Sequence, residues 1–170
     1  QAEHDEEARA MLISDSKDFI SKVNTHLLSF LKSIKRTKIA KKSIKKSGIA
    51  ILVKDISFAH CIANYIAPEH LEIMTKNKKL LAKKIVNAGA IFMGEYTPEA
   101  FGDYIAGPSH VLPTSGNARF DSGLSVLDFL KRTSYIEANK AGLKKTLPSI
   151  ETLGNSEGLD AHVKSAKIRF

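Results

Sequence analysis

The chain has 170 residues, of which 43% are hydrophobic and 26% charged, and this composition is typical of a soluble globular protein with one domain or one domain and a small appendage. No stretch approaches the roughly 20 apolar residues that a membrane span needs, and the polar first residues show no signal-peptide pattern. Because Cys61 is the single cysteine, no internal disulfide can form, and we expect a reducing, cytoplasmic setting in which this thiol is buried and structural.

The formal net charge is +8, and much of the excess lies between residues 32 and 46. A basic run of this kind can bind nucleic acid. However, Ile34, Ile39 and Ile44 interrupt the run, and no aromatic residue is interleaved for base stacking. We therefore interpret it as a solvated helix face, and we expect neither a nucleic-acid partner nor a membrane.

The first half of the chain alternates short apolar runs with amphipathic segments. Phe19, Val23 and Leu27 recur at four-residue steps and predict a helix that Asp15 or Ser16 can cap. The basic segment continues as a second helix, which ends at Gly48. The remaining expected elements are a short helical piece at 1–9, strands at 10–14, 49–53, 71–74 and 90–93, and helices at 56–66 and up to about 86. Strands that alternate with helices predict an α/β fold with a parallel or mixed sheet.

After Gly94 the composition changes. Residues 95–123 are rich in Gly, Pro, Ser, Asp and Asn, which predicts a long irregular segment, and long ordered loops are usually functional. Helical patterns return at 124–130, at 135–153 with an interruption at Pro148, and at 159–168.

Metal-binding and acid/base side chains concentrate in four places, and the first two precede residue 71. Gln1 and His4 are three positions apart and would share one face of a helix, so both could contact one ion, although such residues are often only solvated. Glu69 and His70 follow Pro68, which disfavours helix before it. An adjacent carboxylate and imidazole in a turn can share acid/base work near neutral pH, and the alternative is a surface Glu beside a half-buried His.

The other two places lie in the second half of the chain. Asp103 stands in a glycine-flanked segment after a strand, where α/β sheets bind ligands and where a carboxylate can ligate a metal. His110, which follows it, either takes part or only holds the loop. Glu157 and His162 lie near the C-terminus, where a lone His is usually structural or exposed. A Gln, two His and an Asp suit a zinc shell, but the residues alone predict no more than an α/β domain with a candidate metal site.

Six blocks of the sequence stand out together: 1–5 (QAEHD), 66–72 (IAPEHLE), 107–114 (GPSHVLPT), 118–120 (ARF), 122–126 (SGLSV) and 157–162 (EGLDAH). In their residues, order and separations, these blocks resemble histidinol dehydrogenase, and they span the chain from end to end.

The resemblance implies a zinc-dependent oxidation of L-histidinol to L-histidine with two NAD, the last steps of histidine biosynthesis. It implies that Glu69 and His70 are the general acid/base pair, and it gives His110 no chemical role. The implied zinc ligands are Gln1, His4, Asp103 and His162, and the implied substrate contacts are these four together with His70 and Glu157.

The resemblance also implies an architecture. Residues 1–123 would be the C-terminal half of an incomplete Rossmann-like domain with the active-site loops, and 124–170 a small helical C-terminal domain for dimerisation. The C-terminal segment would reach the partner's site in a homodimer, and the NAD contacts would lie upstream of residue 1. The alternative is a noncatalytic metal-binding or dimerising remnant that lacks the nucleotide-binding half.

Overall fold

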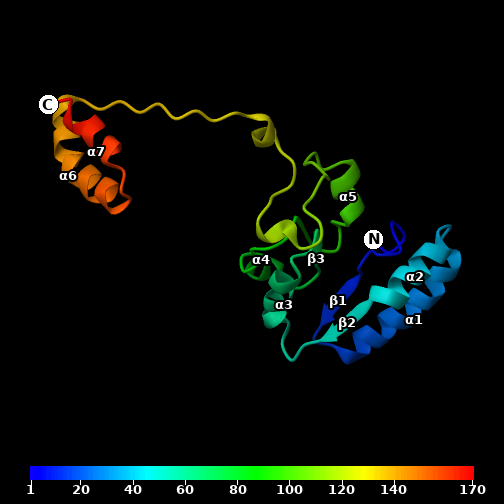
Figure 1. The fold of residues 1–170 in the computed structure, drawn as a ribbon. Helices are drawn as coiled ribbons and strands as arrows, with labels where there is room; N and C mark the ends of the chain where they lie inside the picture. Colours follow the sequence, from blue (N-terminus) through cyan, green and yellow to red (C-terminus); the bar gives the residue numbers. More distant parts are fainter. The chain divides into compact units, whose positions relative to one another are not determined.

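The computed structural model describes residues 1–170, which divide into two compact units, Gln1–Asp128 and Phe129–Phe170. Each unit is described by itself below, with the elements labelled as in Figure 1. None of the helices combines the length and the apolar character that crossing a membrane requires.

The first strand pair of unit 1 is built as a parallel β-α-α-β crossover. Strand β1 (Met11–Ser14) pairs in parallel with β2 (Ile49–Leu52), and the chain between them forms α1 (Lys17–Ser33) and α2 (Thr37–Ser47). Figure 1 shows the two helices side by side next to these strands. As predicted, Ser16 caps α1, because its side chain accepts a hydrogen bond from the Phe19 amide at 3.1 Å.

Helix α2 ends at Gly48, as predicted, but for a different reason than a left-handed cap. The φ angle of Gly48 is −71°, which any residue can adopt. A Cβ atom at this position would lie 2.5 Å from the carbonyl oxygen of Ile44. The glycine is therefore required by the close approach of the backbone.

Residues of α2 contact the first nine residues of the chain. The lysines of α2 are exposed, as predicted, whereas Ser43 is fully buried and donates a hydrogen bond to the Ala8 carbonyl at 2.8 Å. The Lys42 ammonium pairs with Glu6 at 2.8 Å, and Lys46 pairs in the same way with Glu7. The predicted helix at 1–9 is wrong: the segment forms turns, closed by bonds from the His4 amide to Gln1 and from the Ala8 amide to Asp5.

The second half of unit 1 contains a second parallel strand pair. After a 3-10 turn (Ile56–Phe58) and α3 (Ala59–Ile66), the chain forms β3 (His70–Ile73), α4 (Lys78–Ala82) and β4 (Ala90–Met93). Strand β3 pairs with β4, and β1 with β2, so the predicted α/β class and parallel pairing are confirmed. The strands form two two-stranded sheets rather than one, and a Rossmann-like sheet stays a prediction.

Helix α3 packs through small residues, and this decides the environment of the cysteine. Ala59 and Ala63, one turn apart, are buried at 6% and 4% exposure. Cys61 lies two positions from each, on the opposite side of the helix, and is exposed. The prediction of a buried thiol is therefore wrong.

The segment 95–123 is more ordered than its composition indicates. It contains α5 (Glu99–Tyr104) and a 3-10 turn (Asn117–Arg119), so the prediction of a wholly irregular segment is wrong in part. After it, residues 124–130 form only a short 3-10 turn (Val126–Phe129) instead of the predicted helix.

Unit 2 is a helical pair preceded by chain without regular structure. Helix α6 (Lys140–Ser156) packs against α7 (Asp160–Lys167), and Asn139 caps α6 through the Gly142 amide at 2.8 Å. Gly154 allows close contact, since a Cβ there would lie 2.5 Å from a methyl carbon of Val163. Pro148 lies inside α6 and does not interrupt it, contrary to the prediction.

Candidate functional site

Three polar side chains converge between β3 and α5. His70, Glu99 and Asp103 each offer one potential ligand atom, and these atoms all lie within 4.8 Å of one another. His70 is the first residue of β3, whereas Glu99 and Asp103 are four positions apart on α5 and so share one face of that helix. The His70 Nε2 atom lies 3.6 Å from Glu99 Oε1.

Helix α5 is held in place by a strand residue. Pro98 precedes the helix and offers no side-chain cap. The Glu72 carboxylate instead accepts a hydrogen bond from the backbone amide of Glu99 at 3.0 Å. Because residues two apart on a strand face the same side, His70 and Glu72 both face the first turn of α5.

An aromatic ring and a glycine complete the packing around His70. Phe92 on β4 is buried, and its ring centroid lies 6.0 Å from that of His70. A Cβ atom on Gly102 would lie 2.5 Å from the Phe92 ring, so glycine is needed for α5 to approach β4 this closely. The site therefore has one apolar side and one polar side.

The charge distribution in the cluster favours a proton or a cation. Burial raises the pKa of Glu99, and the hydrogen bond and the charge of the neighbouring Asp103 raise it further, whereas the charge of His70 acts in the opposite direction. The His70 Nε2 and Glu99 Oε1 atoms are buried and have no hydrogen-bond partner. Buried polar atoms are normally satisfied, so the pair is suited to bind a proton, a polar group or a metal ion between them.

Arg119, in the segment after α5, contacts the end of α3, from which the chain leads to His70. Arg119 donates hydrogen bonds to the Gly116 carbonyl at 2.9 Å and to the Tyr65 carbonyl at the end of α3. Ala67 then takes a left-handed conformation, with φ of 51°, while its amide bonds to Ala63 at 2.8 Å. This sharp helix end directs the chain through Pro68 and Glu69 into β3.

The two residues of the Glu69–His70 pair have different surroundings. The ion pair of the His70 ring is with Glu99 on α5. Glu69 is half-buried and stands at a bend, and its carbonyl accepts the Ala90 amide at 2.9 Å at the start of the β3–β4 ladder.

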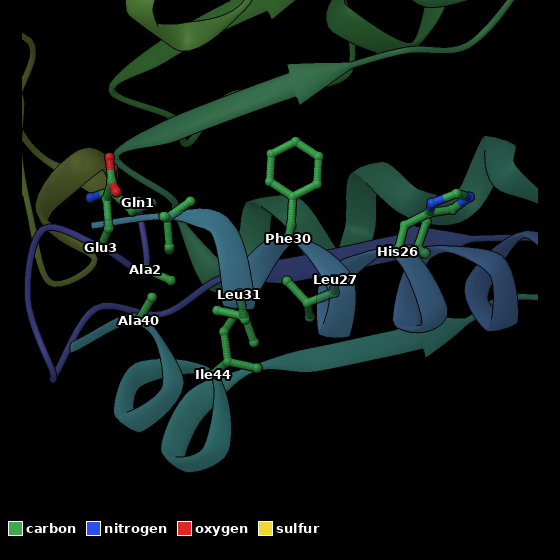
Figure 2. Close-up of a pocket in the computed structure, with 11 residues that line it drawn as sticks. Gln1, Ala2, Glu3, His26, Leu27, Phe30, Leu31, Ala40 and Ile44 are labelled. Carbon is green, nitrogen blue, oxygen red and sulfur yellow. The ribbon is translucent and has the colours of Figure 1, made fainter. Parts of the chain in front are cut away.

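Gln1 and His4 lie in one turn at the start of the chain, rather than on the predicted helix. The His4 amide bonds to the Gln1 carbonyl at 3.1 Å, and Arg36 donates to the His4 carbonyl at 3.2 Å. Gln1 also lines an open groove of about 470 Å³. Figure 2 shows Gln1 and Glu3 at one end of this groove, above Ala40, with the apolar side chains of α1 and α2 along it.

The remaining expected site residues are described each within its own unit. His4 is exposed and is not one of the three clustered groups. Glu157 and His162 belong to unit 2, in which Glu157 follows α6 and His162 lies exposed on α7. His110 is exposed beyond α5. The structure thus brings His70 and Asp103 together, and the other assignments stay predictions.

Glu99 is the clustered residue that the sequence analysis missed. A local signal existed, because Glu99 and Asp103 have the four-residue spacing of one helix face. The glycine- and proline-rich composition around them predicted a loop, in which that spacing has no meaning.

Comparison with known proteins gives one consistent result. The sequence model of the family described as histidinol dehydrogenase matches residues 1–170. Histidinol dehydrogenase 1 of Nostoc sp. is 47% identical over 170 residues, which are 100% of this chain and 39% of that protein. The histidinol dehydrogenase of Gluconobacter oxydans is 49% identical over 170 residues, again 100% of this chain and 40% of that protein.

A solved structure agrees with these sequences. The crystal structure of histidinol dehydrogenase from Elizabethkingia anophelis matches with a TM-score of 0.90 and 30% identity, covering 99% of this chain and 39% of that one. The chain therefore spans about two-fifths of the length of these relatives, from 39% to 40%. A match of this extent and identity shows that the chain belongs to the histidinol dehydrogenase family.

Proposed function

We propose that the protein of which this chain is a part oxidises L-histidinol to L-histidine with NAD, the last steps of histidine biosynthesis. The observation that carries the proposal is the placement of His70 beside Asp103 in a half-buried polar cluster, within a chain of the histidinol dehydrogenase family. A proton acceptor and a metal-ligating carboxylate at one site are what a metal-assisted alcohol oxidation requires.

The residues present fit a zinc ion. Gln1, His4, Asp103 and His162 supply nitrogen and oxygen donors, and Asp103 brings its carboxylate to the cluster with His70 and Glu99. Nitrogen and oxygen donors are suitable zinc ligands. Gln1, His4, Asp103 and His162 would hold the ion, and bound zinc would orient the substrate through its imidazole and amine.

The proton transfers fall to His70 and Glu69. In the first half-reaction, His70 accepts the proton of the alcohol while a hydride leaves the carbinol carbon for NAD, which gives the aldehyde. In the second half-reaction, Glu69 removes a proton from water as it attacks the aldehyde, and a second hydride leaves for another NAD. Two bases in different surroundings suit two proton transfers of different demand.

The assembly is part of the proposal. Residues 124–170 would form a dimerisation segment, and Glu157 and His162 would complete the partner's site in a homodimer. Residues 1–123 would belong to a Rossmann-like domain whose NAD contacts precede residue 1.

The first experiment measures NADH formation by the full-length, zinc-loaded protein with L-histidinol. We expect turnover that stops with a chelator and returns with zinc. His70→Asn should lower kcat by about 10²- to 10⁴-fold and leave the zinc content intact. Asp103→Asn should lose zinc, whereas Asp121→Asn, an exposed control, should not. If the metal-replete protein does not turn over, the proposal fails and a noncatalytic metal-binding or dimerising role is left.

A mixing experiment tests the shared site. His70→Asn and His162→Asn would each inactivate a homodimer. If His162 serves the partner's site, a heterodimer of the two variants has one intact site. Equal mixtures after subunit exchange should recover about a quarter of the wild-type activity. No recovery from demonstrated heterodimers would contradict the shared site.

A further inference from the structure

We propose that Glu99 is a positioning residue: its carboxylate holds the imidazole of His70 through Nε2, so that Nδ1 is the nitrogen that accepts the substrate proton. This inference rests on the proposed function, because it concerns the proton that leaves the substrate alcohol. It assigns a role to a residue outside the acid/base pair and the zinc ligands expected from the sequence.

The geometry between the two side chains is the first observation. The His70 Nε2 and Glu99 Oε1 atoms lie 3.6 Å apart, and the two side chains are only 15% and 25% exposed. Both atoms are buried, and neither has another hydrogen-bond partner. A small rotation of the Glu99 side chain would bring them to hydrogen-bond distance, and hydrogen bonds in catalytic sites are often long before the substrate is bound.

The second observation is the hydrogen bond that holds the backbone of Glu99 against β3. Its backbone amide is bonded to the Glu72 carboxylate at 3.0 Å, and Glu72 stands two residues after His70 on the same face of β3. The ring of His70 is flanked by Phe92 on the neighbouring strand. The strand that carries the imidazole therefore also fixes the start of the helix that carries the carboxylate.

A carboxylate in this place selects one form of the imidazole. Neutral histidine carries its proton on one ring nitrogen, and the hydrogen bond made by one nitrogen decides the state of the other. An ionised carboxylate only accepts hydrogen bonds, so beside Nε2 it favours the form protonated there. Nδ1 of His70 is then left with the lone pair that general-base catalysis needs.

The neighbouring carboxylates are less suited to this role. Glu69 stands at a bend directly before β3, where its carbonyl accepts the Ala90 amide. Glu69 is not among the three clustered groups, and the ion pair of the His70 ring is with Glu99. Asp103 is the residue that the proposed function assigns to zinc.

The test compares Glu99→Gln and Glu99→Ala with wild type in the full-length, zinc-loaded enzyme, and Glu95→Gln serves as the matched control. Glu95 is an exposed carboxylate four residues before Glu99. A glutamine can either donate to or accept from Nε2. It therefore keeps the shape of the glutamate side chain but no longer favours the imidazole form that is protonated at Nε2. We expect kcat to fall about tenfold to a hundredfold in both Glu99 variants, as for other residues that orient a functional histidine.

Three further readouts separate positioning from a purely structural effect. KM for L-histidinol should change by less than about threefold, since ground-state binding is retained. Zinc content should equal that of wild type. In ¹⁵N-histidine spectra, the His70 signals, assigned by their loss in His70→Asn, should show one Nε2-protonated form in wild type and a mixture of forms in Glu99→Gln.

The outcomes are distinguishable. An active wild-type enzyme with Glu99→Gln at wild-type kcat overturns this inference and leaves the proposed function standing. Loss of zinc in Glu99→Gln also overturns it, because Glu99 would then be a ligand of the ion. Inactivity of zinc-loaded wild type refutes the proposed function and this inference with it. If Glu99→Ala does not fold, the isosteric Glu99→Gln, with circular dichroism to check folding, decides the matter.

Discussion

The Glu72 carboxylate accepts a hydrogen bond from the backbone amide of Glu99 at 3.0 Å, so a strand residue caps the helix that carries Glu99 and Asp103. The contact joins residues 27 positions apart in the sequence. A negative charge at a helix N-terminus also interacts favourably with the helix dipole. The cap links the placement of both α5 carboxylates to β3.

Replacing Glu72 with alanine should loosen the first turn of α5. We expect a local loss of about 0.5–2 kcal/mol, the usual contribution of a helix cap. Hydrogen exchange of residues 99–104 should become faster, and zinc affinity should fall because Asp103 moves with the helix. Glu72→Gln, which keeps an acceptor oxygen, should have a smaller effect, and Glu95→Ala should have none. Unchanged exchange in Glu72→Ala would show that α5 does not depend on this cap.

Asn64 should contribute strongly to stability, because it joins α3 to the chain before β4. Its side chain donates to the Lys84 carbonyl at 2.8 Å and accepts from the amides of Val86 and Asn87 at 2.8 and 3.2 Å. Asn64→Ala should lower the free energy of unfolding by about 2–3 kcal/mol, since several backbone groups lose their partner together. Chemical unfolding measures this, with Asn24→Ala on the exposed side of α1 as the control. Equal losses in the two variants would contradict the prediction.

Gly102→Ala should disturb the site through packing alone. The new methyl carbon would lie 2.5 Å from the Phe92 ring, so either the ring or α5 must shift. We expect a loss of about 1–3 kcal/mol, as for other overpacked positions, and a lower kcat because His70 contacts the same ring. Ala100→Ser enlarges an exposed position of the same helix and should be neutral. A fully active, equally stable Gly102→Ala would refute this packing argument.

Asp55 should make stability depend on pH in the acid range. Hydrogen bonds from the backbone and side chain of Ser57, the first at 2.7 Å, hold the pKa of Asp55 below its ordinary 3.8. Because the folded-state pKa is the lower one, the stabilisation is fully present above about 3.8 and is lost as the pH falls through the folded-state value. Asp55→Asn should remove this dependence, whereas Asp15→Asn should not. Parallel unfolding curves for wild type and Asp55→Asn at every pH would contradict it.

Local sequence patterns were sufficient to predict those elements that are formed by contacts between residues near in the chain. The period of apolar residues and the Ser16 cap predicted α1, and the β-branched run after Gly48 predicted β2. The parallel pairing followed from the alternation of strands and helices, because parallel neighbours require a crossover. The six sequence blocks predicted the family, which the comparisons confirm.

Tertiary structure decided the elements whose hydrogen bonds run between distant residues. Residues 1–9 form turns that are held to α2 by the bond from Ser43 to the Ala8 carbonyl and by the pair of Lys42 with Glu6. Helix α5 forms in a glycine- and proline-rich segment, and the distant residue Glu72 caps it. Cys61 is exposed because the buried face of α3 is occupied by small alanines.

The same distinction holds within the site. The sequence offered His70 and Asp103 as candidates, and the resemblance to the family gave them their expected roles, since a motif survives in the sequence whatever the fold does. The pairing of His70 with Glu99 was invisible there, because a contact across a strand and a helix leaves no regular spacing in the chain. Sequence therefore determined which chemical groups are present, and the packing of α5 on β3 decided which of them meet.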